Sequence, residues 1–114
     1  MPDGTVPDVL TSMNRVLTLP VDGPVIASEA DALGVLGDAF GQQAEQVEIP
    51  VQRLDPEFFR LRSGLAGAIT QKFAQYGVRL TVVGDVSRWA AEPGPVADWI
   101  REANQGAGTL RFTG

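Results

Sequence analysis

The sequence predicts one α/β domain, built on a small open mixed sheet of about four to five strands. The later strands are expected to be parallel, and about three to four helices to cover the sheet. Two observations lead to this prediction. Apolar stretches with strand-like spacing alternate along the chain with stretches of helical period. The length of 114 residues is that of a single domain, and 13 glycines and 8 prolines mark frequent turns.

The first half of the chain alternates strands with a helix. Residues 15–21 are predicted to form a strand, and residues 25–26 a short second strand after a turn. A helix over 28–40 is expected because Ser28 can cap it, and because three apolar residues share one helical face: Leu33, Leu36 and Phe40. Residues 46–51 alternate apolar and polar side chains, which is typical of a strand with one buried face.

A long row of apolar residues at helical spacing covers residues 56–76. Gly64 and Gly67 interrupt it, so either one helix spans the segment, or a short turn ends near Ser63 and the main helix starts there. Residues 78–83 form the most apolar stretch, which favours a strand covered on both faces of the sheet.

The last part of the chain predicts a helical turn at 89–91, a helix over 95–105 and a final strand at 109–113. Residues 1–14 have no clear period, and we expect them to be a loose lead-in. The folded domain is therefore predicted to span residues 15–114.

The chain contains no cysteine and no histidine. This excludes disulfides, thiol nucleophiles, Cys or His zinc sites and Ser-His-Asp relays, so we expect no catalytic residue, metal or cofactor. The net charge is −5 and the arginines are scattered, which argues against nucleic acid and membrane surfaces as partners. A partner surface is expected to be neutral or basic. With no apparent targeting segment, the cytoplasm is the expected location.

One segment, residues 58–85, carries a characteristic set of residues: Phe58-Phe59, Leu61, Ser63-Gly64-Leu65-Ala66-Gly67, Ile69, Gln71-Lys72-Phe73, Tyr76, Arg79-Leu80 and Val83-Gly84-Asp85. The closing helix adds Trp99-Ile100, Glu102, Asn104 and Gly106. With these residues the chain resembles the bacterial domain-of-unknown-function family 4180. The resemblance extends from about Val25 onward and implies a bacterial protein, but no activity.

A shorter resemblance concerns Ser63-Gly64-Leu65, which is similar to the phosphoacceptor motif of STAS domains, the anti-sigma factor antagonists. In those domains, which share this order of strands and helices, the serine before Gly-Leu caps a helix and is phosphorylated by a partner kinase. The resemblance therefore implies a STAS-like regulatory module, with Ser63 as phosphoacceptor and a kinase or an anti-sigma-type regulator as partner. This chain has Leu61 and Arg62 where the usual motif has Asp-Ser.

Ser63 has two interpretations from the residues themselves: an ordinary cap for exposed helix N–H groups, or a switch in which a phosphate sits at a helix start. Gly64 and Gly67 also allow two interpretations. Close packing of the helix on the sheet is favoured over a stretch of backbone that is open to a ligand. The predicted partner or ligand surface comprises Arg62, Ser63, Gly64, Gly67, Gly84 and Asp85.

Asp85 follows Gly84 at the carboxyl edge of the predicted sheet, where ligands usually bind in α/β folds. It could cap the next segment, hold a cation or act as a base, and capping is favoured. Lys72 is the only lysine. It could be a nucleophile, but a helix lysine whose stem lies along apolar surface is the simpler interpretation.

These observations favour a non-enzymatic regulatory or protein-interaction module, switched by phosphorylation of Ser63. The alternative is a small-ligand-binding domain, or an enzyme that uses Asp85, Ser63 and Lys72 at the carboxyl edge of the sheet. A third hypothesis is a homodimer that associates through the strand at 109–113 or the region of Trp89.

Overall fold

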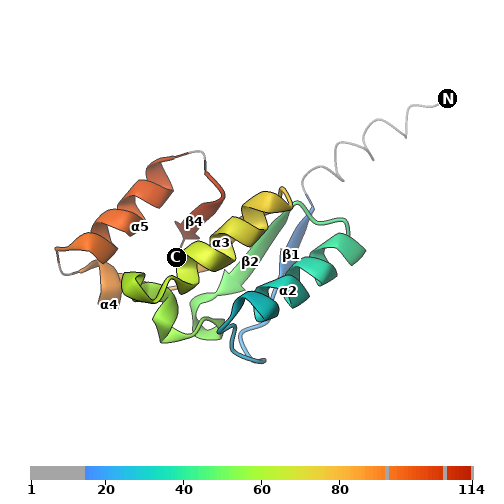
Figure 1. The fold of residues 1–114 in the computed structure, drawn as a ribbon, viewed down its shortest axis with the longest axis horizontal. Helices are drawn as coiled ribbons and strands as arrows, with labels where there is room; N and C mark the ends of the chain where they lie inside the picture. Colours follow the sequence, from blue (N-terminus) through green and yellow to red (C-terminus); the bar gives the residue numbers. More distant parts are fainter. Residues whose placement is uncertain (1–14, 92, 107, 114) are drawn as a thin grey trace.

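The structure, a computed structural model, describes residues 15–91, 93–106 and 108–113 of the chain. The lead-in predicted for residues 1–14 lies outside this part. A four-stranded sheet runs through the domain, with its strands side by side in chain order (Figure 1). The strands are β1 (Val16–Thr18), β2 (Gln46–Pro50), β3 (Arg79–Val83) and β4 (Leu110–Thr113).

The predicted open α/β sheet is confirmed, with one correction to the direction of its first strand. Every neighbouring pair is parallel, β1 included, so the sheet is not mixed. Residues 25–26, predicted as a strand, contribute only an isolated bridge between Ile26 and Leu54. The chain therefore passes from β1 to β2 through a helix, and such a crossover returns it in the same direction.

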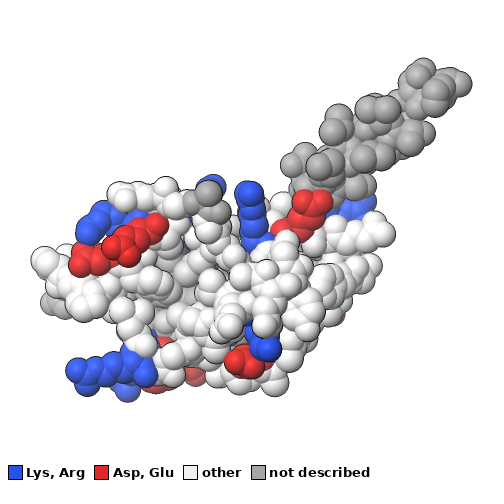
Figure 2. Space-filling view, turned by 45° about the horizontal axis from the view of Figure 1, so that its top comes forward, with Lys and Arg blue, Asp and Glu red and all other residues white. Residues whose placement is uncertain are grey.

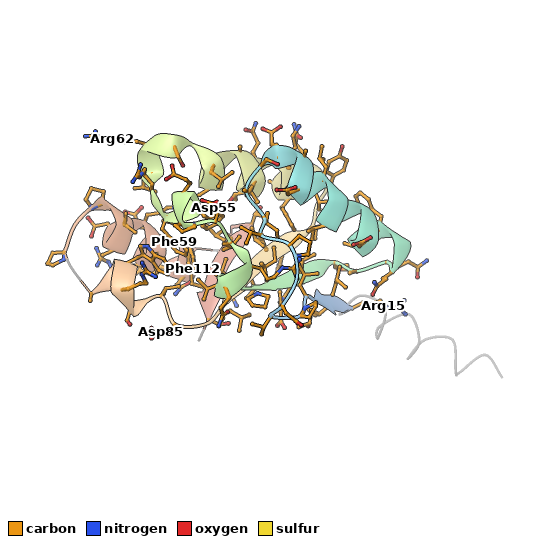
Figure 3. All side chains as sticks on the ribbon, turned by 90° about the horizontal axis from the view of Figure 1, so that it is seen from below. Arg15, Asp55, Phe59, Arg62, Asp85 and Phe112 are labelled. Atoms are coloured by element: carbon orange, nitrogen blue, oxygen red, sulfur yellow. The ribbon has the colours of Figure 1, made fainter. Side chains whose placement is uncertain are left out.

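Three of the described helices cover one face of the sheet: α2 (Glu29–Gly41), α3 (Leu65–Gln75) and α5 (Pro95–Gln105) (Figures 1 and 3). Parallel crossovers are right-handed, so a sheet whose strands follow chain order receives its helices on the same face. The strands bury apolar side chains beneath these helices: Val47, Ile49, Leu80, Val82, Leu110 and Phe112.

The opposite face of the sheet has no helix over it in the described residues. Arg79 of β3 and Arg111 of β4 are exposed there. The prediction that residues 78–83 are covered on both faces therefore holds only in part: on the face without a helix, Thr81 is buried at 6% exposure and Val83 is half-buried, but Arg79 is exposed.

Helix α2 begins as predicted. The Ser28 hydroxyl accepts the Asp31 N–H at 3.1 Å, and the Asp31 carboxylate accepts the Ala27 N–H at 2.9 Å. The buried face differs from the expected one, since Leu33 and Phe40 are 41% and 49% exposed. Small residues instead bring the helix close to the sheet, and the buried side chains are Ala32, Val35, Leu36 and Ala39.

The segment 56–76 follows the second of the two predicted alternatives. Two 3₁₀ turns, η3 (Pro56–Phe59) and η4 (Leu61–Ser63), precede the main helix α3, which begins at Leu65. The Asp55 carboxylate starts η3 by accepting the Glu57 N–H at 2.9 Å. Gly64 has a φ of 75°, a left-handed conformation that redirects the chain from η4 into α3.

The packing interpretation of Gly64 and Gly67 is wrong. A Cβ added at either position would meet no heavy atom within 4 Å, so neither glycine lets the helix approach the sheet. Gly64 instead allows the left-handed backbone conformation between η4 and α3, and Gly67 is exposed. Close packing occurs at Gly84, where φ is 133° and an added Cβ would lie 2.7 Å from Cγ1 of Val51.

Arg53, in the turn η2 (Val51–Arg53), is a structural residue that the sequence analysis missed. Its side chain is buried, with Nε donating to the Pro24 carbonyl at 2.7 Å and Nη1 to the Pro20 carbonyl at 2.9 Å. It thereby fastens the loop after β1 to the exit of β2. A charged donor that bonds two carbonyls is among the stronger hydrogen-bonding arrangements in proteins.

Candidate functional site

An open groove lies at the carboxyl edge of the sheet, where the chain leaves β2 and β3. It is formed by η3, η4, the short helix α4 (Ser87–Ala90) and the start of α5. Its volume is about 540 Å³. We call it the aromatic groove, and its lining residues are Pro56, Glu57, Phe59, Arg60, Leu61, Arg62, Trp89, Pro95 and Val96. Edges of this kind are where ligands usually bind in open α/β sheets.

The floor of the aromatic groove is a stacked pair of rings. Phe59 and Trp89 lie parallel, with an interplanar angle of 9° and centroids 3.8 Å apart. Trp99 supports them from α5, meeting Phe59 at 6.3 Å and Phe112 of β4 at 5.3 Å between centroids. Both tryptophans are thus anchors in an aromatic cluster. Edge-to-face contacts such as those of Trp99 stabilise by about 0.5–1.5 kcal/mol each beyond area burial.

Arginines border this floor. Nη1 of Arg60 is 3.4 Å from Oε2 of Glu57, and the Arg60 side chain is 70% exposed. The guanidinium carbon of Arg88 lies 4.6 Å from the Trp89 ring centroid, in cation–π contact. Arg62 projects away from the body of the molecule (Figure 3). The guanidinium groups of Arg60 and Arg88 and the Glu57 carboxylate therefore border an apolar floor, while that of Arg62 points outward, in a chain whose net charge is −5.

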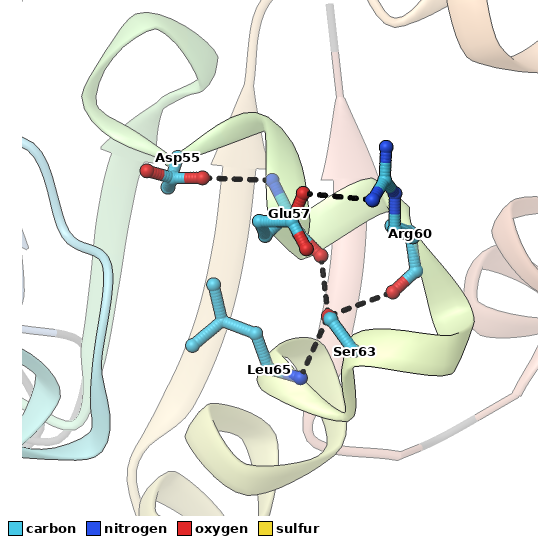
Figure 4. Close-up of polar contacts among 5 residues, drawn as sticks. All are labelled: Asp55, Glu57, Arg60, Ser63 and Leu65. Atoms are coloured by element: carbon cyan, nitrogen blue, oxygen red, sulfur yellow. Dashed lines mark hydrogen bonds and ion pairs between the residues drawn. The ribbon is translucent and has the colours of Figure 1, made fainter.

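Ser63 joins the turns η3 and η4 to the start of α3, a junction beside the groove that we call the corner (Figure 4). Its hydroxyl lies 2.7 Å from the Glu57 carbonyl and 2.8 Å from the Arg60 carbonyl, and it donates its single hydrogen to them. The same oxygen accepts the Leu65 N–H at 3.1 Å. The cap position of α3 is Gly64, so Ser63 caps from one residue further out while tying η3 and η4 to the helix.

The remaining predicted surface residues do not gather around Ser63. Gly67 lines a second groove of about 510 Å³ between α3 and α5, while Gly84 packs on Val51. Asp85 lies on the opposite side of the molecule from Arg62 in Figure 3. The six residues therefore occupy separate places, and only Arg62, Ser63 and Gly64 lie together at the corner.

Asp85 has the capping role that the sequence analysis favoured. Its Oδ1 accepts the Ser87 N–H at 2.8 Å at the start of α4. Hydrogen bonds from the side chain and the backbone of Ser87 hold the pKa of the Asp85 carboxyl below its ordinary value of 3.8. This carboxyl stays ionised well into acid, which makes it a poor general base near neutral pH.

Lys72 lies on α3 facing α2, with Nζ 3.9 Å from Oε1 of Glu29. It stands seven positions beyond Leu65, or about 10 Å along the helix axis. Lys72, Ser63 and Asp85 thus serve three different local contacts and form no common centre. In the part of the chain that the structure describes, no group of three acidic side chains is arranged to hold a metal ion.

The groove could not be found from the sequence because its parts are distant in the chain. Phe59 and Trp89 are 30 positions apart, and Phe59 was named only as part of the Phe58-Phe59 motif of the family resemblance. The alternation of Arg60 and Arg62 with apolar residues directly after Phe58-Phe59 is the one local signal that could have indicated a charged rim. Nothing local pairs that segment with Trp89.

The surface gives little further indication of a partner. On the face shown in Figure 2, acidic and basic side chains lie beside one another in small groups, with uncharged surface between the groups. None of the described helices has the length and apolarity needed to cross a membrane.

Comparison with known proteins identifies a family but no characterised relative. The model of a domain of unknown function (DUF4180) matches residues 11–113. Searches of curated proteins and of solved structures give no significant match. The similarity of Ser63-Gly64-Leu65 to STAS domains therefore stays a prediction.

Proposed function

The chain belongs to the DUF4180 family, and we propose that it is a non-enzymatic protein-interaction module. Its aromatic groove binds an acidic segment of a partner protein that carries an apolar side chain. The observation behind this proposal is the stacked Phe59–Trp89 floor bordered by exposed arginines. No convergent set of nucleophile, base and oxyanion donors competes with it among the described residues.

The floor is suited to an apolar anchor because it is already ordered. Phe59 is 4% exposed and fixed by its neighbours, while Trp89 is half-buried and lines the groove. Phe59 covers one face of the Trp89 ring and the Arg88 guanidinium lies over the ring as well, so a partner side chain contacts the ring edge or takes the place of Arg88. It is then desolvated without the entropy cost of assembling the rings. Tryptophan and arginine are also the residues that most often dominate binding energy at interfaces.

The exposed arginines at the rim of the aromatic groove favour a negatively charged partner segment. The overall charge of the chain suggests a neutral or basic partner, but short-range contacts are governed by the local groups. Arg60 and Arg62 are exposed at the groove, and a guanidinium matches a carboxylate in bidentate geometry. We therefore revise the expected partner to an acidic segment.

Phosphorylation of Ser63 is the regulatory part of the proposal, in keeping with the STAS-like interpretation. A phosphate adds about −1.5 to −2 charges and removes the hydroxyl hydrogen. It would face the carbonyl oxygens of Glu57 and Arg60, which now lie 2.7 and 2.8 Å from the hydroxyl oxygen. The contacts of Ser63 with these two carbonyls must therefore break. The phosphate then competes with the partner segment for Arg60 and Arg62.

A library of displayed random peptides, selected on the full chain, tests the binding proposal. We expect enriched peptides to combine acidic residues with one aromatic or aliphatic residue. A synthetic peptide of that sequence should bind at least tenfold more weakly to Arg60→Glu/Arg62→Glu and to Trp89→Ala. The control is Arg101→Glu on α5, whose guanidinium pairs with Asp98 at 2.6 Å, and it should change affinity less than twofold.

Several outcomes contradict the proposal. They are selection of basic peptides, no enrichment at all, or binding that the rim variants leave unchanged. If small acidic aromatic compounds bind the groove and peptides do not, the chain is a small-ligand-binding domain instead. For regulation, a chain carrying phosphoserine at position 63 should bind the peptide more weakly than Ser63→Ala, and equal binding to the unmodified chain would refute the switch.

A further inference from the structure

The uncovered face of the sheet carries a polar hollow that is separate from the aromatic groove. It has a volume of about 190 Å³ and lies over β2, β3 and β4. Apart from Gly108, every residue that lines it is polar. We call it the sheet hollow, and the residues on which the inference rests are Gln46, Arg79, Thr81, Thr109, Arg111 and Thr113.

The strand register brings two arginines together in this hollow. Thr81 of β3 pairs with Arg111 of β4, and Arg79 stands two residues before Thr81 on the same face. Arg79 and Arg111 are therefore diagonal neighbours on parallel strands, and the strand spacing and rise place their Cα atoms about 8 Å apart. Two like charges within about one Debye length of each other repel, so an anion bound between them is favoured.

One carboxylate lines the hollow, that of Glu48. The ion pairs in the described residues are Arg60–Glu57, Lys72–Glu29 and Arg101–Asp98, and none involves Arg79 or Arg111. Glu48 pairs with Thr81 in the strand register, but its Oε1 accepts the Thr18 hydroxyl at 3.0 Å, on the side of β1. Among the described residues, no carboxylate therefore forms an ion pair with either arginine.

We propose that the sheet hollow binds a small, multiply charged oxyanion of the phosphate class. Two guanidinium groups supply charge and paired N–H donors, which match the oxygen geometry of such an anion. Thr109 and Thr113 add hydroxyl donors at the same hollow. The volume accommodates a single phosphate-sized group, so a phosphoryl group is bound either as the free ion or at the end of a small organic molecule.

Titration calorimetry on the full chain tests this site, with inorganic phosphate, O-phosphoserine and chloride compared at constant ionic strength. We expect at least one of the two phosphates to bind at least tenfold more tightly than chloride. The preference between inorganic phosphate and O-phosphoserine identifies whether the free ion or a carried phosphoryl group is the source. Arg79→Gln and Arg111→Gln should each weaken this binding at least tenfold.

The matched control is Arg101→Gln, which removes one exposed guanidinium from α5 and should alter phosphate binding less than twofold. Amide chemical shifts of the unmodified chain give a second readout, because phosphate should move resonances of β3 and β4 and leave those of α4 in place. Phosphate binding no tighter than chloride, or binding that survives both substitutions, overturns the proposal. So does a dimer that both substitutions dissociate while phosphate has no effect, since a second copy would then cover this face.

Discussion

Replacing Ser63 by alanine tests whether one hydroxyl fastens the corner beside the aromatic groove. The change removes the donor to the Glu57 and Arg60 carbonyls and the acceptor of the Leu65 N–H. The single hydrogen makes one donated bond at a time, so two hydrogen bonds are lost. At about 0.5–1.5 kcal/mol net for each bond, and toward the lower end at an exposed residue, unfolding should become easier by about 1–2 kcal/mol.

Urea unfolding followed by circular dichroism measures this loss. The midpoint should fall without a change in the slope, because the surface exposed on unfolding is the same. Ser63→Thr is the matched control, since it keeps the hydroxyl and should restore most of the stability. If Ser63→Ala unfolds within about 0.3 kcal/mol of the unmodified chain, the hydroxyl does not hold the corner. The regulatory part of the proposed function would then lose its structural basis.

Three further predictions concern packing, buried charge and pH. Gly84→Ala should destabilise the chain by about 1–3 kcal/mol in urea unfolding, because its Cβ would clash with Val51 at a left-handed backbone conformation. Gly67→Ala lies on an open helix surface and should stabilise the chain by about 0.5–1 kcal/mol. Equal effects of the two substitutions on stability would refute this contrast. Arg53→Met should lower the free energy of unfolding by about 2–4 kcal/mol, because two carbonyls lose a charged donor. A change below about 1 kcal/mol would contradict this. The lowered pKa of Asp85 means that its contribution to stability is present above the ordinary value of 3.8 and is lost as pH falls through the folded-state pKa. Asp85→Asn should therefore reduce the difference in stability between neutral and acidic solution, and an unchanged acid profile would count against that role.

The local elements of the fold were predictable because their causes are local. Ser28 caps α2 through a bond to a residue three positions away, and Asp55 starts η3 through one two positions away. Alternation in residues 46–51 identifies β2 because the strand has one buried face. Each of these depends on side chains close together in sequence, which is the information that periodicity and capping rules use.

The candidate site was less predictable because its contacts join distant segments. Arg53 bonds to carbonyls 29 and 33 positions earlier in the chain, and a single arginine in a polar turn gives no sign of this. The stack of Phe59 on Trp89 depends equally on the order of the strands, which places the exits of β2 and β3 side by side. The prediction of close packing at Gly67 was wrong because a small residue in a helix is equally compatible with open surface.

The strand order also explains how an acidic chain can have the two anion sites that we propose. With strands in chain order, helices collect on one face, so the sheet hollow stays open while the exits of β2 and β3 form the aromatic groove. Arginines concentrate at both places, but the groove adds an apolar floor and the hollow does not. Added sodium chloride should therefore weaken phosphate binding at the hollow steeply, because that binding is almost entirely electrostatic and is screened within about 10 Å at 0.1 M salt. Peptide binding at the groove should fall less, since contact with Phe59 and Trp89 persists when charges are screened. Equal salt dependence at the two sites would show that the stacked rings contribute little to binding, and would leave the arginines as the only source of affinity.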